Sequence, residues 1–327
     1  MTKKGLCVIG DIHTSDNPAK YKQCSDFFKW FLGTEYNSDD WDKLFLGDIF
    51  DEAEPSNQCI GLVLGFLYSL KGLKYIVTGN HDRNPATNAL EIYLALDSVT
   101  LITKDTEMDI EGYKCLMLPH MDTENLGLPP MTQYYNQKIK DEYSKHKYDF
   151  IFHHLEDDSK HFSSDFVDTS SLKGKFLAGH IHTADILEGG HYLGSVCKNS
   201  KDEAEDTKYL ACISYSEKKK VDYVEVPSFL EYDSLEYPNL PESYDKTTLY
   251  TITKAPTKRD ALMHYEKEFE NHGSVFYPLK IINIRNEIIY EEGGNGELQS
   301  ERDYLNLYGS ENNIKQSIID KCMELLG

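Results

Sequence analysis

The segment GLCVIGDIH, residues 5–13, decides the fold. Its apolar run, residues 5–9, is typical of a buried strand, and a glycine, an aspartate and a histidine follow almost at once. Glycine lets the backbone turn sharply, and a strand end is a rigid mount for a carboxylate and an imidazole. The same succession of strand and ligand-type side chains recurs four more times before residue 183.

Short apolar runs alternate with amphipathic stretches through the first half of the chain. Strands are predicted at residues 43–46, 73–78, 99–103, 148–152 and 175–178, a hairpin at 108–118, and helices at 21–32, 56–70 and 132–147. This βαβ rhythm predicts an α/β fold with helices on both faces. Because parallel strands end at one shared edge, the polar clusters should meet at the carboxyl ends of the strands.

The character of the sequence changes after residue 194. A hairpin is predicted at residues 209–226, a linker punctuated by prolines at 227–241, a smaller βαβ-like unit at 249–284 (helix 258–271, last strand 279–284), a glycine-rich break at 291–296 and an amphipathic helix at 314–326. The predicted organisation is a core over residues 1–196, additional core strands with a small α+β domain over 197–290, and a C-terminal helical segment over 291–327.

Composition excludes several classes of protein. The 327 residues include 55 acidic and 34 basic side chains, a net charge of −21, with 40% hydrophobic residues. That apolar content excludes a disordered chain, and the longest nearly uncharged apolar run, residues 60–70, is too short for the roughly 18 residues of a membrane span. The acidity means that any nucleic-acid-binding face must be a local patch.

The N-terminus and the cysteines indicate a cellular compartment. No basic, apolar and small-residue succession opens the chain, so no signal peptide is expected. The seven cysteines are odd in number and never form a C-x-x-C pair, which argues against a disulfide framework and a thiolate zinc site. We expect a cytoplasmic protein without membrane association.

Five polar clusters carry the chemistry, and each follows a predicted strand. They are GDIH (10–13), GDIFD (47–51), GNHD (79–82), HH (153–154) and GHIH (179–182). Aspartate, asparagine and histidine without cysteine form the ligand set of Mn²⁺, Fe or Zn²⁺ with open positions for substrate. One Asp-x-His pair is more often a cap or a surface pair, but five clusters in this order predict two metal ions bridged by a carboxylate. Spacing alone leaves His153 and His154 open; if the strand persists, Phe152 and His154 share one face.

The succession of these motifs over residues 5–196 resembles the calcineurin-like metallophosphoesterase superfamily, which implies its fold and a dimetal site. By this resemblance one ion is bound by Asp11, His13 and His182, the other by Asn80, His154 and His180, with Asp48 as the bridge. His154 is favoured because an apolar residue and an acid follow it, as in the nearest relatives. The resemblance implies two divalent ions, most simply Mn²⁺, that activate water for attack on a phosphoester.

The same resemblance assigns supporting residues. His81, within GNHD, would be the catalytic acid or would orient the scissile phosphate. Asp51, Asp82 and His153 would hold the ligands in place.

A narrower resemblance covers most of the chain. GDIFD, GNHD with Asp82, and GHIHT followed by a hairpin to residues 192–195 are similar to the SbcD-type DNA repair nucleases and the small subunit of the phage recombination endonuclease. This implies an exo- and endonuclease acting on DNA in recombination and repair. It makes the core over residues 1–196 catalytic and the α+β unit within residues 197–290 a capping domain that shapes DNA access. It also implies docking to a coiled-coil ATPase of the SbcC type through residues 314–326, homodimerisation, and a host-cytoplasm location if the chain is phage-encoded. The chain departs from the pattern at Val196, where the relatives carry proline.

Several basic residues could contact the phosphates of DNA, and two other functions would fit the same motifs. Lys20, Arg83 and Lys198 are candidate DNA-binding residues, with Lys201 and the run 218–220 as weaker candidates. A small-molecule phosphodiesterase or a protein phosphatase would use the same ions. A catalytically idle scaffold is the third reading, but it would have no need of His81.

Overall fold

The computed structural model describes residues 4–84, 88–157, 166–217, 220–236, 239–240, 248–253 and 265. All of these fall in one compact unit, residues 1–282. The predicted helix at 258–271 apart from Tyr265, the strand at 279–284, the break at 291–296 and the helix at 314–326 lie outside the described residues. The predicted capping domain, the C-terminal segment and their boundaries therefore stay predictions.

The larger sheet has six strands in the order β10-β9-β1-β2-β3-β4. Its strands are β1 (Gly5–Ile9), β2 (Trp41–Phe45), β3 (Lys74–Val77), β4 (Val99–Ile102), β9 (Lys208–Ser214) and β10 (Val221–Val226). Strands β1 to β4 are parallel, whereas β9 runs antiparallel to β1 and forms a hairpin with β10. The parallel strands place the ends of β1, β2 and β3 at one edge.

The second sheet has four strands in the order β5-β6-β7-β8. They are β5 (Thr106–Ile110), β6 (Tyr113–Leu118), β7 (Phe150–His153) and β8 (Lys175–Ala178). Strands β6, β7 and β8 are parallel, and β5 joins β6 through the predicted turn at Glu111 and Gly112.

A separate parallel pair joins β11 (Glu231–Glu236) to β12 (Thr248–Thr253). The prediction of a linker over 227–241 is therefore wrong for the residues of β11. Prolines nearby suggested a break, and the partner that makes these residues a strand lies further along the chain, where a local pattern cannot reveal it.

Among the described residues, three α-helices cover the sheets: α1 (Pro18–Leu32), α2 (Asn57–Ser69) and α3 (Met131–Asp141). The Asn17 side chain accepts hydrogen bonds from the backbone amides of Ala19 and Lys20 at 3.1 and 3.2 Å, which caps α1. Ser56 caps α2 in the same way. The helix predicted over 132–147 ends earlier, and a short 3₁₀ turn, η2 (Tyr143–Lys145), follows. Three further short turns were not predicted: η1 (Ala89–Ala95), η3 (Ile186–Glu188) and η4 (Lys201–Glu203).

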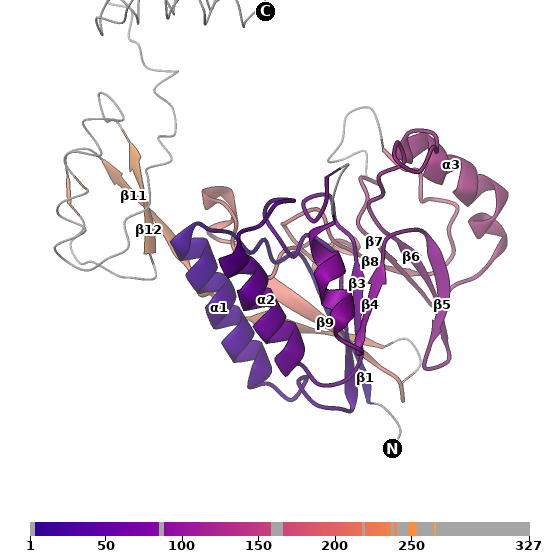
Figure 1. Ribbon diagram of the computed structural model, residues 1–327, viewed down its shortest axis with the longest axis horizontal. Helices are drawn as coiled ribbons and strands as arrows, with labels where there is room; N and C mark the ends of the chain where they lie inside the picture. Colours follow the sequence, from indigo (N-terminus) through magenta and orange to yellow (C-terminus); the bar gives the residue numbers. More distant parts are fainter. Residues whose placement is uncertain are drawn as a thin grey trace, which may run out of the picture. The chain divides into compact units, whose positions relative to one another are not determined.

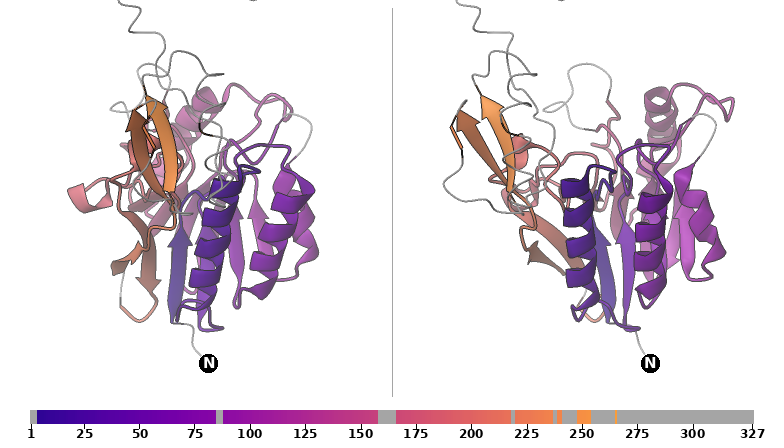
Figure 2. Two further views of the ribbon diagram at one scale, coloured as in Figure 1. Left: turned by 90° about the vertical axis from the view of Figure 1, so that its left-hand side faces the viewer. Right: turned by 60° about the vertical axis from the view of Figure 1, so that its left-hand side comes forward.

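Alternating side chains divide the core into layers. In β1, Cys7 and Ile9 pack toward α1 and α2, while Leu6 and Val8 pack with the inner residues of the second sheet. In β7, Phe152 faces the first sheet and Ile151 packs with residues of α3. The order is helices, sheet, sheet, helix, and Figures 1 and 2 show α1 and α2 together on one outer face with α3 on the other. The predicted α/β fold is confirmed, and the helices cover only the outer faces because the inner faces pack on each other.

No helix among the described residues is long and apolar enough to cross a membrane. The six cysteines that the structure describes are all free thiols and buried.

We predict that Phe66→Ala destabilises the layer between α2 and the six-stranded sheet. Phe66 stacks on Phe28 with ring centroids 4.0 Å apart and also contacts Phe31 and Phe45 edge-on. Removing a buried ring of this kind costs about 3–5 kcal/mol of unfolding free energy, which urea denaturation would measure. Tyr68→Ala on the same helix is the control, because Tyr68 is 78% exposed. A similar loss in both variants would contradict the layer assignment.

Candidate metal centre

The two sheets bring the ends of five strands together. The backbone N–H of His154 donates to the Leu118 carbonyl, and that of Gly179 donates to the His153 carbonyl, both at 3.0 Å, so the second sheet stays regular up to its edge. The His180 backbone N–H donates to Asp11 Oδ2 at 2.8 Å, which joins this edge to the end of β1 in the first sheet. The predicted convergence of the polar clusters at the carboxyl ends is what the structure shows.

The first group of predicted ligands is Asp11, His13 and His182, whose donor atoms lie within 4.8 Å of one another. His182 Nε2 lies 2.9 Å from His13 Nε2. The other ring nitrogen of each histidine faces a carboxylate: His182 Nδ1 lies 3.1 Å from Glu203 Oε1, and His13 Nδ1 lies 3.3 Å from Asp51 Oδ1. Carboxylates behind the rings favour Nδ1–H tautomers, which turn both Nε2 lone pairs toward one point, as a shared cation requires.

The second group is Asn80, His154 and His180. Asn80 Oδ1 lies 3.0 Å from His154 Nε2 and 2.9 Å from His180 Nδ1. His154 Nδ1–H donates to the Leu46 carbonyl at 2.7 Å, which fixes the ring and directs Nε2 into the group. One amide oxygen and two imidazole nitrogens therefore converge.

Asp48 lies between the two groups, as a bridging ligand must. Its Oδ2 is 3.6 Å from His13 Nε2 and 3.3 Å from His154 Nε2, while its Oδ1 accepts a hydrogen bond from the His81 backbone N–H at 2.8 Å. The structure thus brings together all seven residues predicted as ligands. Their metal-binding roles themselves stay predictions.

The buried charges of this site fit divalent cations. Asp11 Oδ1 is buried and has no hydrogen-bond partner among the described residues. Burial, helped by the charge of Asp48, raises the pKa of Asp11 to about 7. Burial works against the charged form of His154, yet the carboxylates of Asp48 and Asp11 raise its pKa to about 10. Without metal the site must therefore hold protons where cations would compensate the carboxylates. These residues fit two divalent metal ions.

Backbone strain is concentrated at the site. Of the four non-glycine residues with positive φ among the described residues, three are predicted ligands: His13 (55°), Asp48 (46°) and His180 (81°). Such conformations are costly for residues with a side chain and persist where the surroundings impose them. Close approach adds a second constraint, since a Cβ on Gly179 would lie 2.4 Å from Asp11 Oδ1.

The supporting residues lie around the ligands. His81 is exposed beside the first group, with its ring 5.0 Å from that of His13, and its Nδ1–H donates to the Asp51 carbonyl at 2.7 Å. Asp82 is buried and accepts backbone hydrogen bonds from Ile49, Phe50 and Gly79, so it holds the turns that carry Asp48 and Asn80.

His153 lies elsewhere. Its ring points away from the ligands toward Asp157, with Nε2 3.3 Å from Asp157 Oδ2. Among the described residues the His153 side chain therefore has no contact with a predicted ligand, and only its backbone supports them, through the peptide link to His154 and the hydrogen bond from Gly179 next to His180.

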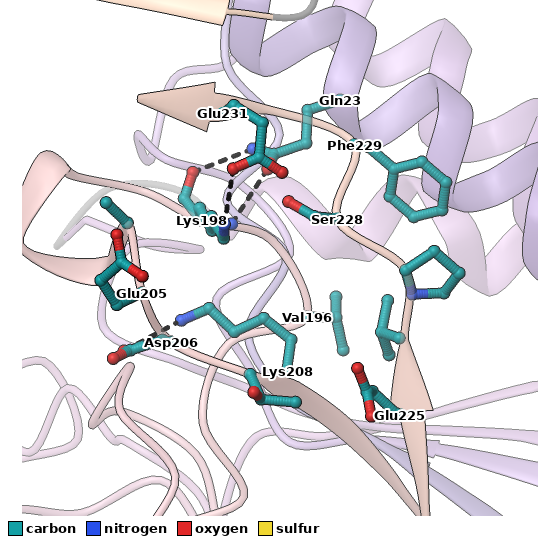
Figure 3. Close-up of a pocket in the computed structure, with 14 residues that line it drawn as sticks. Gln23, Val196, Lys198, Glu205, Asp206, Lys208, Glu225, Ser228, Phe229 and Glu231 are labelled. Carbon is teal, nitrogen blue, oxygen red and sulfur yellow. Dashed lines mark hydrogen bonds and ion pairs between the residues drawn. The ribbon is translucent and has the colours of Figure 1, made fainter. Parts of the chain in front are cut away.

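The three candidate phosphate contacts are each paired with an acid. Lys20 Nζ lies 3.2 Å from Asp51 Oδ2, and an Arg83 guanidinium nitrogen lies 3.3 Å from Asp122 Oδ2. Lys198 is buried in the wall of a separate pocket of about 270 Å³, where its ammonium lies 3.2 Å from Glu231 (Figure 3). None of the predicted metal ligands lines that pocket, so the structure does not bring Lys198 to the site.

Two residues near the site were missed from the sequence. Glu203, in η4, faces His182 and also pairs with Lys208 at 2.7 Å. It stands in a charged, loop-like stretch without any periodic signal. His120 is half-buried and lines, together with Asn80, a pocket of about 310 Å³. His120 follows β6 as the other clusters follow their strands, so the strand-end rule could have found it.

Comparisons with known proteins give one family match and two similar solved structures. The family model for calcineurin-like phosphoesterase matches residues 6–184. Two similar solved structures are an archaeal phosphodiesterase (TM-score 0.35, 12% identity, 67% of this chain and 98% of the other) and a protein of unknown function from Aquifex aeolicus (TM-score 0.30, 16% identity, 52% and 87%). No curated protein matches the sequence.

We predict that metal binding releases protons. His154, with its pKa raised to about 10, and Asp11, with its pKa raised to about 7, are protonated or partly so at pH 7 without metal. Loading should therefore release about one to two protons and strengthen as the pH rises through neutrality. Titration calorimetry with Mn²⁺ in two buffers of different ionisation enthalpy measures the release. Identical heats in both buffers would contradict the buried charge pattern.

We also predict that Gly179→Ala disrupts the site while Gly61→Ala does not. The new methyl group at residue 179 would meet Asp11 Oδ1 at 2.4 Å and His154 Nδ1 at 3.0 Å, whereas nothing lies within 4 Å of a Cβ at Gly61. We expect metal affinity to fall about 10–100-fold in the first variant and unfolding free energy to rise by up to about 1 kcal/mol in the second. Equal metal affinities, measured by calorimetry, would show that the close approach is unimportant.

Proposed function

Since this chain belongs to the calcineurin-like phosphoesterase family, we propose that it is a metal-dependent phosphodiesterase that cleaves DNA. Family membership indicates hydrolysis of a phosphoester with divalent metals, and the site holds Asp and His groups suited to bind them. We propose further that the phosphoester is a diester and that the substrate is DNA.

The observation that carries the diester is the neutralisation of the cationic side chains beside the site. Lys20 pairs with Asp51 and Arg83 pairs with Asp122. A phosphomonoester is close to a dianion at neutral pH and would gain from free cations, whereas a diester carries one negative charge. The pairing therefore favours the diester over a phosphatase substrate.

His81 is the residue best placed to act on the substrate. Its Nδ1–H is engaged by the Asp51 carbonyl, so Nε2 is the nitrogen left for a substrate. When protonated, Nε2 can donate to a phosphate oxygen and so orient the phosphate, or donate to the departing oxygen. Bound divalent ions would supply an activated water and Lewis-acid polarisation of the phosphoryl group.

DNA as substrate rests on the resemblance of the motifs to SbcD-type nucleases. The net charge of −21 opposes DNA binding by the chain alone, so its affinity should be weak and fall steeply with salt. We propose that an SbcC-type coiled-coil ATPase supplies the phosphate-tracking surface and docks on residues 314–326, with Mn²⁺ as the working metal. We also propose that the chain forms a homodimer in the cytoplasm. If the gene is viral, this is the cytoplasm of the phage-infected host.

The proposal is tested with the purified chain in Mn²⁺. We predict faster hydrolysis of bis-p-nitrophenyl phosphate than of p-nitrophenyl phosphate, and cleavage of end-labelled single- or double-stranded DNA, both abolished by EDTA. His81→Ala should lower kcat about 10²–10⁴-fold because an acid or orienting group is lost. His146→Ala, an exposed histidine outside the site, is the matched control and should leave the rate unchanged.

Two outcomes would count against the proposal. A preference for the monoester would favour a phosphatase. Diester hydrolysis with DNA untouched would sink the stand-alone nuclease and favour the small-molecule phosphodiesterase, unless addition of the ATPase subunit restored DNA cleavage.

A further inference from the structure

We propose that His153, Asp157 and His191 form a third divalent-metal site, of the Zn²⁺ type, separate from the candidate dimetal centre. One donor atom from each residue lies within 4.8 Å of the others. None of the three belongs to the seven predicted ligands. The site therefore adds an ion-binding function that neither the family match nor the nuclease proposal contains.

His153 is the residue whose burial points to a bound ion. Its side chain is 0% exposed, and neither Nδ1 nor Nε2 has a hydrogen-bond partner among the described residues. Nε2 lies 3.3 Å from Asp157 Oδ2, but without the alignment of a hydrogen bond. A buried imidazole without a hydrogen bond at either nitrogen is costly, and a metal ion bound by one of its nitrogens would remove much of that cost.

The spacing of the donor atoms matches ligands of one ion. Two donors about 2.1 Å from Zn²⁺ at a tetrahedral angle lie roughly 3.4 Å apart. His153 Nε2 is 3.3 Å from Asp157 Oδ2, and His191 Nε2 makes a hydrogen bond of 3.1 Å with the other oxygen, Oδ1. One ion bound by all three residues would therefore take both oxygens of Asp157 and replace that hydrogen bond. Two imidazoles and one carboxylate form a ligand set for Zn²⁺ and related divalent ions and a poor one for Mg²⁺ or Ca²⁺.

The surroundings hold the carboxylate and leave an approach. Thr169 Oγ1 donates to Asp157 Oδ2 at 2.9 Å, and the Tyr192 hydroxyl donates to Oδ1, so Asp157 is oriented from the protein side. His191 is 27% exposed in its side chain, so the cluster reaches the surface at this residue.

The two centres lie on opposite sides of one strand end. Side chains two residues apart in a strand share a face. His153 therefore lies on the side of Ile151, which packs with α3, and His154 lies on the side of Phe152, which faces the first sheet. The third ion would link β7 to the segment next to Tyr192, which pairs with Ala178 in an isolated bridge. It would brace the strand that presents His154.

The test counts bound Zn²⁺ in the full-length chain. Metal-free protein is dialysed against Zn²⁺ and analysed by mass spectrometry of metals, for the wild type, His191→Ala, Asp157→Asn and the control His146→Ala. We expect His191→Ala and Asp157→Asn each to bind one equivalent less than the wild type, and His146→Ala to match it. The rise in melting temperature on adding Zn²⁺ should also shrink in the two site variants.

Each result has a clear meaning. Equal Zn²⁺ content in the wild type and both site variants would overturn the proposal and leave the cluster as an ion-paired Asp–His network. If the dimetal proposal itself fails, all four proteins lose the same equivalents and the difference of one remains. If His191→Ala fails to fold, Asp157→Asn, which preserves shape, still decides.

Discussion

The structure depends on one electrostatic constraint: two carboxylates, Asp11 and Asp48, lie buried beside four imidazoles at the edge of two sheets. Burial alone would protonate the acids and neutralise the histidines. Their mutual field instead keeps His154 charged and holds the pKa of Asp48 well below its usual range, despite burial. In the metal-free chain, protons therefore occupy places that divalent cations can take. The fold and metal binding therefore depend on the same buried charges.

The two-sheet architecture meets this constraint by rigidity. Each sheet supplies ligands from strand ends, and the inner faces pack on each other so that neither edge can move alone. Left-handed backbone at His13, Asp48 and His180 is an energetic cost that this packing imposes. Flexible loops could avoid such strain, but they could not hold seven donor atoms at fixed separations.

The sequence was sufficient for the fold of the core and the convergence of the clusters, because both follow from periodicity and strand order. Alternation along β7 also indicated that His154, not His153, shares the face of Phe152. The contribution of Glu203 could not be predicted, since it approaches His182 through a tertiary contact from a stretch with no pattern. The acids facing Lys20, Arg83 and Lys198 escaped prediction for the same reason: a basic residue reveals its charge but not its partner.

Two adjacent histidines show how much one strand end can carry. Because successive side chains alternate, His153 and His154 reach opposite faces of the sheet and enter different clusters. The peptide between them is short and rigid, and the His154 N–H is bonded to Leu118. Any group that fixes the His153 ring therefore also limits the position of the His154 ring. A metal-binding cluster on the outer face would then act on the candidate dimetal centre through the backbone, without touching its ligands.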